Sequence, residues 1–240
     1  MTRTTDELFR NDSYLKNCTA TVTHIDERGV QLDQSVCYPH GGGQLGDHGK
    51  LVLNNGNVLN ITDTQKDRNT SEQFHVVETD QAQQLSVGDS LTVELDWDRR
   101  FKLMRFHTCL HLVCAMIDAP VNGGSIQLDR ARLDFDLKEP LDKEQLTEKL
   151  NLLINKDASI SMRWITDAEL DAHPELVRTM SVTPPRNAEG TIRLVEIDGI
   201  DLQACGGTHV NSTSEIGQMI VRKIENKGKQ NRRITVIAAD

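Results

Sequence analysis

Two short motifs, far apart in the chain, each carry two imidazole or thiol side chains four positions apart. The first motif holds His107 and His111, and the second holds Cys205 and His209. Two side chains at this spacing lie one turn apart on the same face of an α-helix, where both can bind one ion. If the fold brings the two motifs to one point, it creates a four-donor metal site, and this requirement constrains the topology more than any other feature of the sequence.

The residues around the first motif predict a helix over residues 99–117. Apolar side chains recur there at helical spacing, and the two histidines fall at the edge of the apolar stripe rather than on the solvent face. The stripe comprises Leu103, Phe106, Leu110, Val113, Cys114 and Ile117. A lone histidine pair beside such a stripe is more often part of a core, but a second pair makes coincidence less plausible. Imidazole and thiolate donors favour Zn²⁺ over magnesium or calcium, which prefer oxygen ligands.

The composition is that of an ordinary soluble protein. The chain has 240 residues, enough for one large or two small domains, and its net charge of -9 argues against indiscriminate binding to nucleic acid. There is no apolar run of membrane-spanning length and no apolar signal core at the N-terminus. The five cysteines are odd in number and lack disulfide-framework spacing. We therefore expect a cytoplasmic protein without membrane association.

Residues 1–96 predict a β-rich domain. Cys18, Ala20 and Val22 alternate with threonines, and residues 91–96 show the same period of two. Shorter candidate strands lie between them, at residues 30–32, 50–53, 58–62 and 74–77. The pattern is typical of a small barrel or sandwich.

A glycine-rich loop over residues 38–47 is the unusual feature of this domain. It contains Gly41, Gly42 and Gly43, followed by Gln44. Glycines adopt positive φ readily and expose backbone N–H groups, so the loop is either a hairpin turn or a cradle for a phosphate, ribose or nucleotide end. Composition alone favours the turn.

Residues 97–240 predict an α+β domain with helices against a mainly antiparallel sheet. Asp98 is a candidate N-cap for the histidine helix. Residues 119–125 predict a break between the histidine helix and the next strand. Within this break, Asn122 and Ser125 suit either the rim of a pocket or a turn. Further elements are a helix over 141–155, a capping box at Thr166, a loop over 180–190, and strands near 132–136, 160–164, 192–194, 219–224 and 233–238.

Basic residues cluster between the last two predicted strands. They are Arg222, Lys223, Lys227, Lys229, Arg232 and Arg233, opposed only by Glu225. One interpretation is a solvated hairpin. The other joins them with Arg99, Arg100, Lys102 and Arg105 beside the metal helix into a path for a phosphate backbone.

Taken together, these motifs resemble the editing domain of alanyl-tRNA synthetase and its free-standing AlaX relatives of medium length. The resemblance rests on residues 107–111, 124–125, 132–136, 205–210 and the glycine-rich loop 38–47, and it covers nearly the whole chain. It implies a small β-barrel domain over 1–96 followed by a two-layer editing domain over 97–240. It also implies an editing enzyme acting in trans, because the chain has no room for an aminoacylation or tRNA-recognition domain.

The resemblance further implies a reaction. The expected substrate is tRNA(Ala) bearing the wrong amino acid, chiefly serine with glycine as a second candidate, and the expected partner is the acceptor end of that tRNA. The expected reaction is hydrolysis of the aminoacyl ester, with Zn²⁺ bound by His107, His111, Cys205 and His209. We expect no obligatory protein partner.

Polar side chains near these motifs are candidates for water orientation or recognition of the serine hydroxyl. They are Thr108, Gln44 and Thr208, each of which suits local hydrogen bonding equally well. Candidate substrate contacts are Gly41, Gly42, Gly43, Asn122, Ser125 and Arg105. No glutamate follows His107, so the general base of His-Glu-x-x-His metalloproteases is not available here.

The ligand count leaves an alternative open. Four protein ligands fill a tetrahedral shell, as in structural zinc sites, whereas catalytic zinc keeps one position open. Either one ligand, of which His209 is the first candidate, leaves the metal, or the coordination expands when substrate binds. Two other functions also remain: an editing module of the threonyl type, and a non-catalytic RNA-binding module that zinc stabilises.

Overall fold

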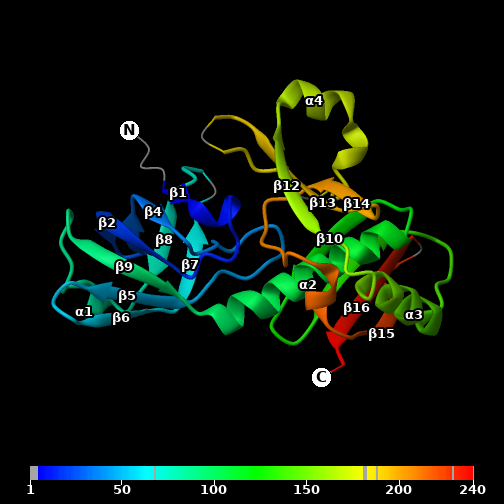
Figure 1. Cartoon of the computed structure of the whole chain (residues 1–240), viewed down its shortest axis with the longest axis horizontal. Coiled ribbons are helices and arrows are strands. Elements are labelled where there is room, and N and C mark those ends of the chain that lie inside the picture. The colour runs from blue at the N-terminus through cyan, green and yellow to red at the C-terminus, as the bar shows by residue number, and fades with distance from the viewer. Residues whose placement is uncertain (1–4, 68, 181–182, 188, 229, 240) are drawn as a thin grey trace. The chain divides into compact units, whose positions relative to one another are not determined.

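The computed structural model describes residues 5–67, 69–180, 183–187, 189–228 and 230–239 (Figure 1). The chain divides into two compact units, Met1–Phe101 and Lys102–Asp240. The predicted domain limits, 1–96 and 97–240, stay predictions. Among the described residues, no helix has both the length and the apolar character needed to cross a membrane.

The first unit contains a seven-stranded antiparallel sheet in the order β6-β5-β9-β2-β3-β8-β7. Its strands are β2 (Asn17–Asp26), β3 (Gly29–Leu32), β5 (Gly49–Leu53), β6 (Val58–Ile61), β7 (Asp63–Lys66), β8 (Gln73–Val76) and β9 (Ser90–Leu95). Short elements complete the unit: β1 (Asp6–Glu7) pairs with β4 (Gln34–Ser35), and the helices are η1 (Leu8–Arg10) and α1 (Thr79–Ala82). The predicted small barrel is not confirmed, because no described strand joins the edge strands β6 and β7 to each other.

The alternation of apolar residues explains the core of this unit. Ala20 and Val22 on β2 and Leu91 and Val93 on β9 are buried together, while the threonines between them lie on the other face. The strands predicted near residues 18–22, 30–32, 50–53, 58–62, 74–77 and 91–96 are confirmed.

The glycine-rich loop forms a tight hairpin. The backbone N–H of Gly41 donates to the carbonyl of Gln44 at 3.1 Å, and the N–H of Gln44 donates to the carbonyl of Gly41 at 2.9 Å. Gly42 and Gly43 occupy the two turn positions with φ of 55° and 84°. Positive φ at both positions is the requirement of a type I′ turn, which explains why two glycines stand there. The turn interpretation is therefore confirmed for residues 41–44.

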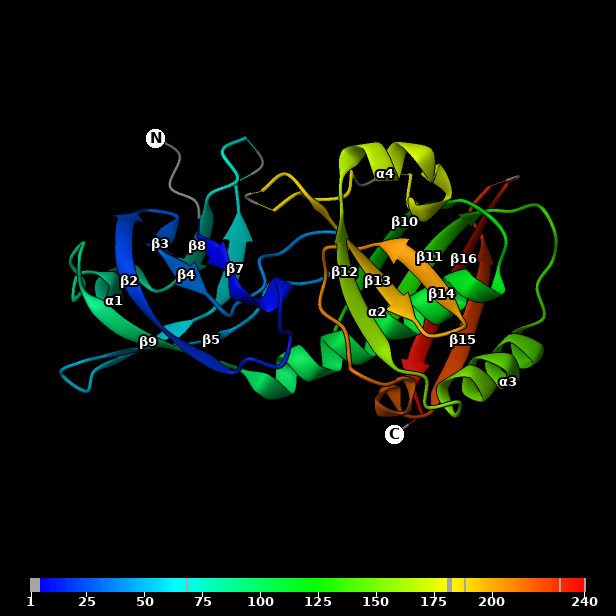
Figure 2. The same ribbon diagram turned by 45° about the horizontal axis from the view of Figure 1, so that its top comes forward.

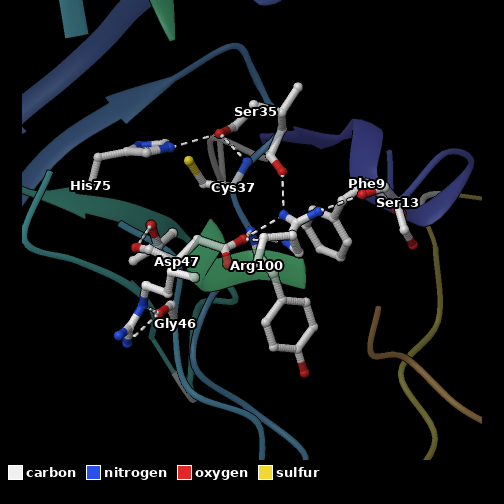
Figure 3. A network of polar contacts seen from close by, with 12 residues as sticks. Phe9, Ser13, Ser35, Cys37, Gly46, Asp47, His75 and Arg100 are labelled. Atoms are coloured by element: carbon white, nitrogen blue, oxygen red, sulfur yellow. Dashed lines mark hydrogen bonds and ion pairs between the residues drawn. The ribbon is translucent and has the colours of Figure 1, made fainter. Parts of the chain in front are cut away.

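A buried ion pair anchors the first turn of α2 (Trp97–Met116) in the first unit (Figure 3). Arg100 and Asp47 are both fully buried, and Nε of Arg100 lies 2.9 Å from Oδ2 of Asp47. The guanidinium also donates to the carbonyls of Ser13 at 3.0 Å and Val36 at 2.6 Å. Asp96, rather than the predicted Asp98, caps the helix, because its Oδ1 accepts the N–H of Arg99 at 3.1 Å.

The second unit contains two antiparallel sheets, with α2 between them in both views (Figures 1 and 2). The larger has the order β10-β11-β16-β15 and comprises β10 (Val121–Ile126), β11 (Ala131–Asp136), β16 (Asn231–Ala238) and β15 (Met219–Asn226). The smaller comprises β12 (Ile160–Ile165), β13 (Ile192–Ile197) and β14 (Asp201–Ala204). The helices are α3 (Lys143–Ile154), α4 (Asp167–Ala172), η2 (Pro174–Leu176) and η3 (Thr213–Ile216). The α+β class with mainly antiparallel strands is confirmed.

The predicted break over residues 119–125 is wrong for most of its length, because β10 begins at Val121. Glycines weaken a strand, but pairing with β11 along Gly123 to Ile126 overrides that local preference. The predicted capping box at Thr166 is confirmed at the start of α4. In the loop predicted over 180–190, residues 181, 182 and 188 lie outside the described part of the chain.

Helix α3 lies beside the edge strand β15 (Figure 2), and two of its side chains bond to part of that edge. The amide of Asn151 accepts the N–H of Met219 at 3.0 Å and donates to its carbonyl at 2.7 Å. Oγ1 of Thr147 accepts the N–H of Val221 at 3.1 Å. These bonds satisfy backbone groups that a neighbouring strand would otherwise pair.

Candidate metal centre

Helix α2 brings the first pair of donors together as predicted. His107 and His111 lie on one face with ring centroids 5.4 Å apart, and their side chains are buried. Leu103, Leu110 and Val113 of the predicted apolar stripe are buried beside them. All residues of α2 over 106–114 are buried, so the histidines are held in packed surroundings where rotamer freedom is small.

The second pair follows β14. Arg193 on β13 is 1% exposed and holds the turn that contains Cys205. Its Nε donates to the carbonyl of Cys205 at 3.0 Å, and its Nη2 donates to the carbonyl of Gly207. The turn returns the chain so that His209 is fully buried. A buried guanidinium thus fixes the backbone that carries the thiol.

The two pairs meet in one cluster. One ligand atom each of His107, His111, Cys205 and His209 lies within 4.8 Å of the others. Sγ of Cys205 lies 3.4 Å from Nε2 of His107 and 3.3 Å from Nε2 of His209. Tetrahedral zinc, with Zn–S of about 2.3 Å and Zn–N of about 2.0 Å, separates sulfur from nitrogen by roughly 3.5 Å. Donor chemistry and spacing therefore both fit a zinc ion.

The electrostatics of the cluster also suit a metal. Although burial alone raises the pKa of Cys205, the three histidines hold the pKa of its thiol well below the ordinary value. Burial opposes charge on His111, but the Cys205 thiolate and Asp201 raise the pKa of His111 to about 9. Burial and the neighbouring His107 hold the pKa of His209 well below its ordinary value. The shifts of Cys205 and His209 favour the thiolate and the neutral imidazole, which are the forms that bind a metal.

Two groups around the cluster orient its imidazoles. Oδ2 of Asp201 lies 3.2 Å from Nδ1 of His111 and also accepts from Nε2 of Gln203 at 2.6 Å. Oγ1 of Thr108 lies 3.1 Å from Nδ1 of His209 and accepts the N–H of Val210 at 3.3 Å. Because Nδ1 of each ring is occupied, Nε2 remains as the metal donor in both.

Asp201 and Arg193 were missed by reasoning from the sequence. A carboxylate that supports a metal-bound histidine is a common arrangement, but Asp201 lies far from His111 in the chain and no local spacing connects them. Arg193 falls within an apolar strand pattern, Ile192–Ile197. A charged residue at a position where burial is expected is the one signal that could have drawn attention to it.

The remaining predicted site residues are distributed as follows. Thr208, which precedes His209 in the sequence, is fully buried. Nε of Arg105 donates to the carbonyl of Ile216 at 2.7 Å. Asn122 is exposed at a bulge of β10, and Ser125 lies on the same strand. In the first unit, Gln44 is fully buried, while residues 41–43 form the hairpin described above. Their roles toward a substrate stay predictions.

The predicted basic path beside α2 needs correction. Arg100 is fully buried and paired with Asp47, so it cannot meet a phosphate. Arg99 donates to the carbonyl of Gly46 at 3.0 Å. Of the predicted basic hairpin, Lys229 lies outside the described residues.

Comparison with known proteins identifies the family. The alanyl-tRNA editing protein AlaX-M of Saccharolobus solfataricus is 36% identical over 234 residues, which cover 96% of this chain and 97% of that protein. The chain belongs to the AlaX-M family of alanyl-tRNA editing proteins. The AlaX-M protein of Methanosarcina mazei is 35% identical over 241 residues, or 96% of this chain and 95% of that protein. The family predicted from the motifs is therefore confirmed.

The sequence of the chain also matches part of a larger protein. The alanine–tRNA ligase of Sulfurisphaera tokodaii is 32% identical over 231 residues, 92% of this chain but 25% of the ligase. Two family models match separate segments. Residues 192–235 match the threonyl and alanyl tRNA synthetase second additional domain, and residues 8–99 match the class II (A) tRNA synthetases. The first of these segments contains Cys205 and His209 together with Asp201 and Arg193.

Proposed function

We propose that the chain is a trans-editing hydrolase that deacylates mischarged tRNA(Ala). Its chief substrate is the seryl form, with the glycyl form second, and it hydrolyses the aminoacyl ester at the acceptor end without ATP. The observation that carries the proposal is the four-donor cluster of His107, His111, Cys205 and His209 in a chain that matches AlaX-M proteins over nearly its full length. The tRNA substrate supports a cytoplasmic location.

The need for a second site has a physical basis. A synthetase pocket built for alanine discriminates against one missing or added small group by only about 1–3 kcal/mol. Glycine lacks the methyl group and serine adds one hydroxyl, so both escape strong rejection. For serine, a polar group in the editing site that pairs with the hydroxyl absent from alanine can discriminate far more strongly, whereas glycine offers no such group and is the second substrate in this proposal.

The side chains of the cluster have separable tasks. A zinc ion bound by the four donors would polarise the ester carbonyl, acidify a water molecule or anchor the amino group of the substrate. Thr108, fully buried and bonded to His209, acts as a positioning residue in this proposal. Asp201 does the same for His111.

The burial and contacts of the donors bear on which ligand could leave the metal. His209 is fully buried and held at Nδ1 by Thr108, whereas Cys205 is partly exposed. These contacts support His209 as a retained ligand, although from the sequence alone it is the first candidate to leave. Expansion of the coordination on substrate binding is the alternative that these contacts favour.

Thr208, Gln44, Gly41, Gly42, Gly43, Asn122, Ser125 and Arg105 remain the proposed contacts to water or to the acceptor end. Thr208 adjoins His209 in the sequence and is fully buried, so in this proposal it acts from within the packed surroundings of the cluster. The glycine hairpin exposes Gly42 to solvent and leaves its backbone accessible.

The test is deacylation of three substrates by the purified protein: seryl-tRNA(Ala), glycyl-tRNA(Ala) and alanyl-tRNA(Ala). We expect rapid loss of the seryl ester, slower loss of the glycyl ester and an intact alanyl ester. Cys205→Ala should lose bound metal and activity together. Cys18→Ala removes a thiol of the first unit that is not a ligand and serves as the matched control.

Other outcomes separate the alternatives. Hydrolysis of a seryl ester on tRNA(Thr) in preference to tRNA(Ala) would indicate the threonyl type of editing. A protein that binds zinc and tRNA but leaves all three esters intact would be a non-catalytic RNA-binding module. Full activity after complete removal of the metal would exclude zinc from the mechanism.

A further inference from the structure

The outer face of the four-stranded sheet in the second unit holds a cavity of about 560 Å³. Its lining includes Ser125, Arg130, Arg132, Arg222, Lys223 and Arg233, and we call this surface the basic trough. Along β11, Ala131, Leu133 and Phe135 are buried, so Arg132 between them points to the opposite face. The basic trough therefore lies on the face of the sheet opposite to these buried side chains, and α2 lies between this sheet and the smaller one (Figures 1 and 2).

The strand register aligns the basic trough across the whole sheet. Ser125 pairs with Arg132, Arg132 with Thr235, and Thr235 with Lys223. These pairs form one row over four strands, and at about 4.8 Å between strands the row is roughly 14 Å long. A surface of this length suits an extended ligand better than a single small anion.

The charges of the basic trough are only partly neutralised. Arg233 makes a bidentate pair with Asp134, with both N–O distances 2.7 Å. Lys223 lies 2.9 Å from Glu225. Arg132 and Arg222 have no hydrogen bond or ion pair within the part of the chain that the structure describes, which leaves two guanidinium groups for a ligand. The concentration of positive side chains on one face of a chain with net charge -9 indicates an anionic partner.

The backbone of the sheet gives a ligand room to approach. β10 is the edge strand beside the row, and a Cβ added at Gly123 would meet no atom within 4 Å. A glycine inside a strand commonly marks close approach by another molecule. At the other end of the row, the register of β15 shifts between Val221 and Lys223, which makes Arg222 the extra residue of a β-bulge. A bulge changes the direction in which a side chain points.

We propose that the basic trough binds the sugar–phosphate backbone of an RNA duplex, which in the proposed function is the acceptor stem of the tRNA. Duplex RNA is recognised mainly through its shape and phosphates, and unpaired arginines on an open sheet match that chemistry. Because α2 and its histidines lie on the other face of the sheet, the basic trough contacts the stem and not the terminal nucleotide. It contributes binding energy without taking part in the chemistry.

Binding of an uncharged acceptor-stem hairpin, followed by fluorescence anisotropy over a range of salt, tests the proposal without any deacylation. The double variant Arg132→Gln/Arg222→Gln should bind about tenfold more weakly or worse, since each phosphate contact is charge-assisted. Its slope of log K against log salt should become shallower by about 1 to 2. Arg132→Lys/Arg222→Lys keeps both charges and should recover most of the affinity.

Lys149→Gln is the matched control, because it removes one exposed charge from α3 outside the basic trough. Equal affinity and equal salt slope for the wild type, the control and the double glutamine variant would overturn the proposal, as would a wild type that does not bind the hairpin. In the deacylation assay the glutamine variant should raise KM and leave kcat unchanged. If hairpin binding responds as expected while no ester is hydrolysed, the RNA surface stands and the proposed function fails.

Discussion

The carboxylate of Asp201 lies 3.2 Å from Nδ1 of His111, and both side chains are buried. This contact fixes the imidazole so that Nε2 faces the other three donors. Loss of such a supporting group usually lowers metal affinity about 10- to 100-fold. Asp201→Asn should therefore weaken zinc binding by that factor, measured by competition with a chelator. Asp198→Asn, an exposed neighbour, should leave the affinity unchanged.

Thr108→Val should damage the cluster through His209. The valine keeps the shape but leaves Nδ1 of His209 and the N–H of Val210 without a partner in a buried region, at a cost of about 1–3 kcal/mol. We expect a lower free energy of unfolding and faster metal loss. Thr108→Ser retains the hydroxyl and should restore both. If the valine variant matches the wild type in both measurements, the positioning role of Thr108 is wrong.

Arg193→Met should release the turn that carries Cys205. The carbonyls of Cys205 and Gly207 would lose charge-assisted hydrogen bonds, so the free energy of unfolding should fall by about 3 kcal/mol. Urea denaturation with and without bound metal measures the change. The same substitution at exposed Arg163 on β12 controls for the loss of an arginine from this sheet. An unchanged metal content in the Arg193 variant would show that the turn keeps its conformation without the hydrogen bonds from Arg193.

The first unit should lose stability in mild acid because of His75. This side chain is fully buried between the carbonyl of Val30 and the hydroxyl of Ser35, and burial lowers its pKa to about 4. As pH falls from about 6.5, the unfolded chain takes up a proton that the folded chain does not. The stabilisation is therefore complete above pH 6.5, and about 3 kcal/mol is lost as pH approaches 4.

Urea unfolding at several pH values measures this loss. His75→Gln should remove this part of the pH dependence, while His40→Gln, at an exposed position, should keep it. If the two variants and the wild type give parallel curves, His75 does not titrate as its burial implies.

The cluster of four candidate metal donors could be predicted from the sequence because the spacing within each pair is local. His107 and His111 are tied by one helical turn, and Cys205 and His209 by one short motif, so each pair is visible without the fold. The meeting of the two pairs could be predicted because four imidazole or thiolate donors complete the tetrahedral shell of one zinc ion. Most strands of both units could likewise be read from the period of two, which burial on one face imposes.

The residues that support the donors could not be predicted in this way. Asp201 reaches His111 through the packing of β14 against α2, and nothing local links the two. Asp96 caps α2 in place of Asp98, because the helix begins at Trp97, two residues before the predicted start at residue 99. The glycines of β10 suggested a break, but the neighbouring strand supplies the hydrogen bonds that local propensity could not anticipate.

The side chains of Asn151 and Thr147 have a consequence for how copies of the protein meet one another. They occupy the N–H and C=O groups of Met219 and the N–H of Val221, which an unprotected edge would offer to a strand from another molecule. The larger sheet consequently cannot grow by strand addition along this part of β15. We expect these two side chains of α3 to protect the domain against association through this part of β15.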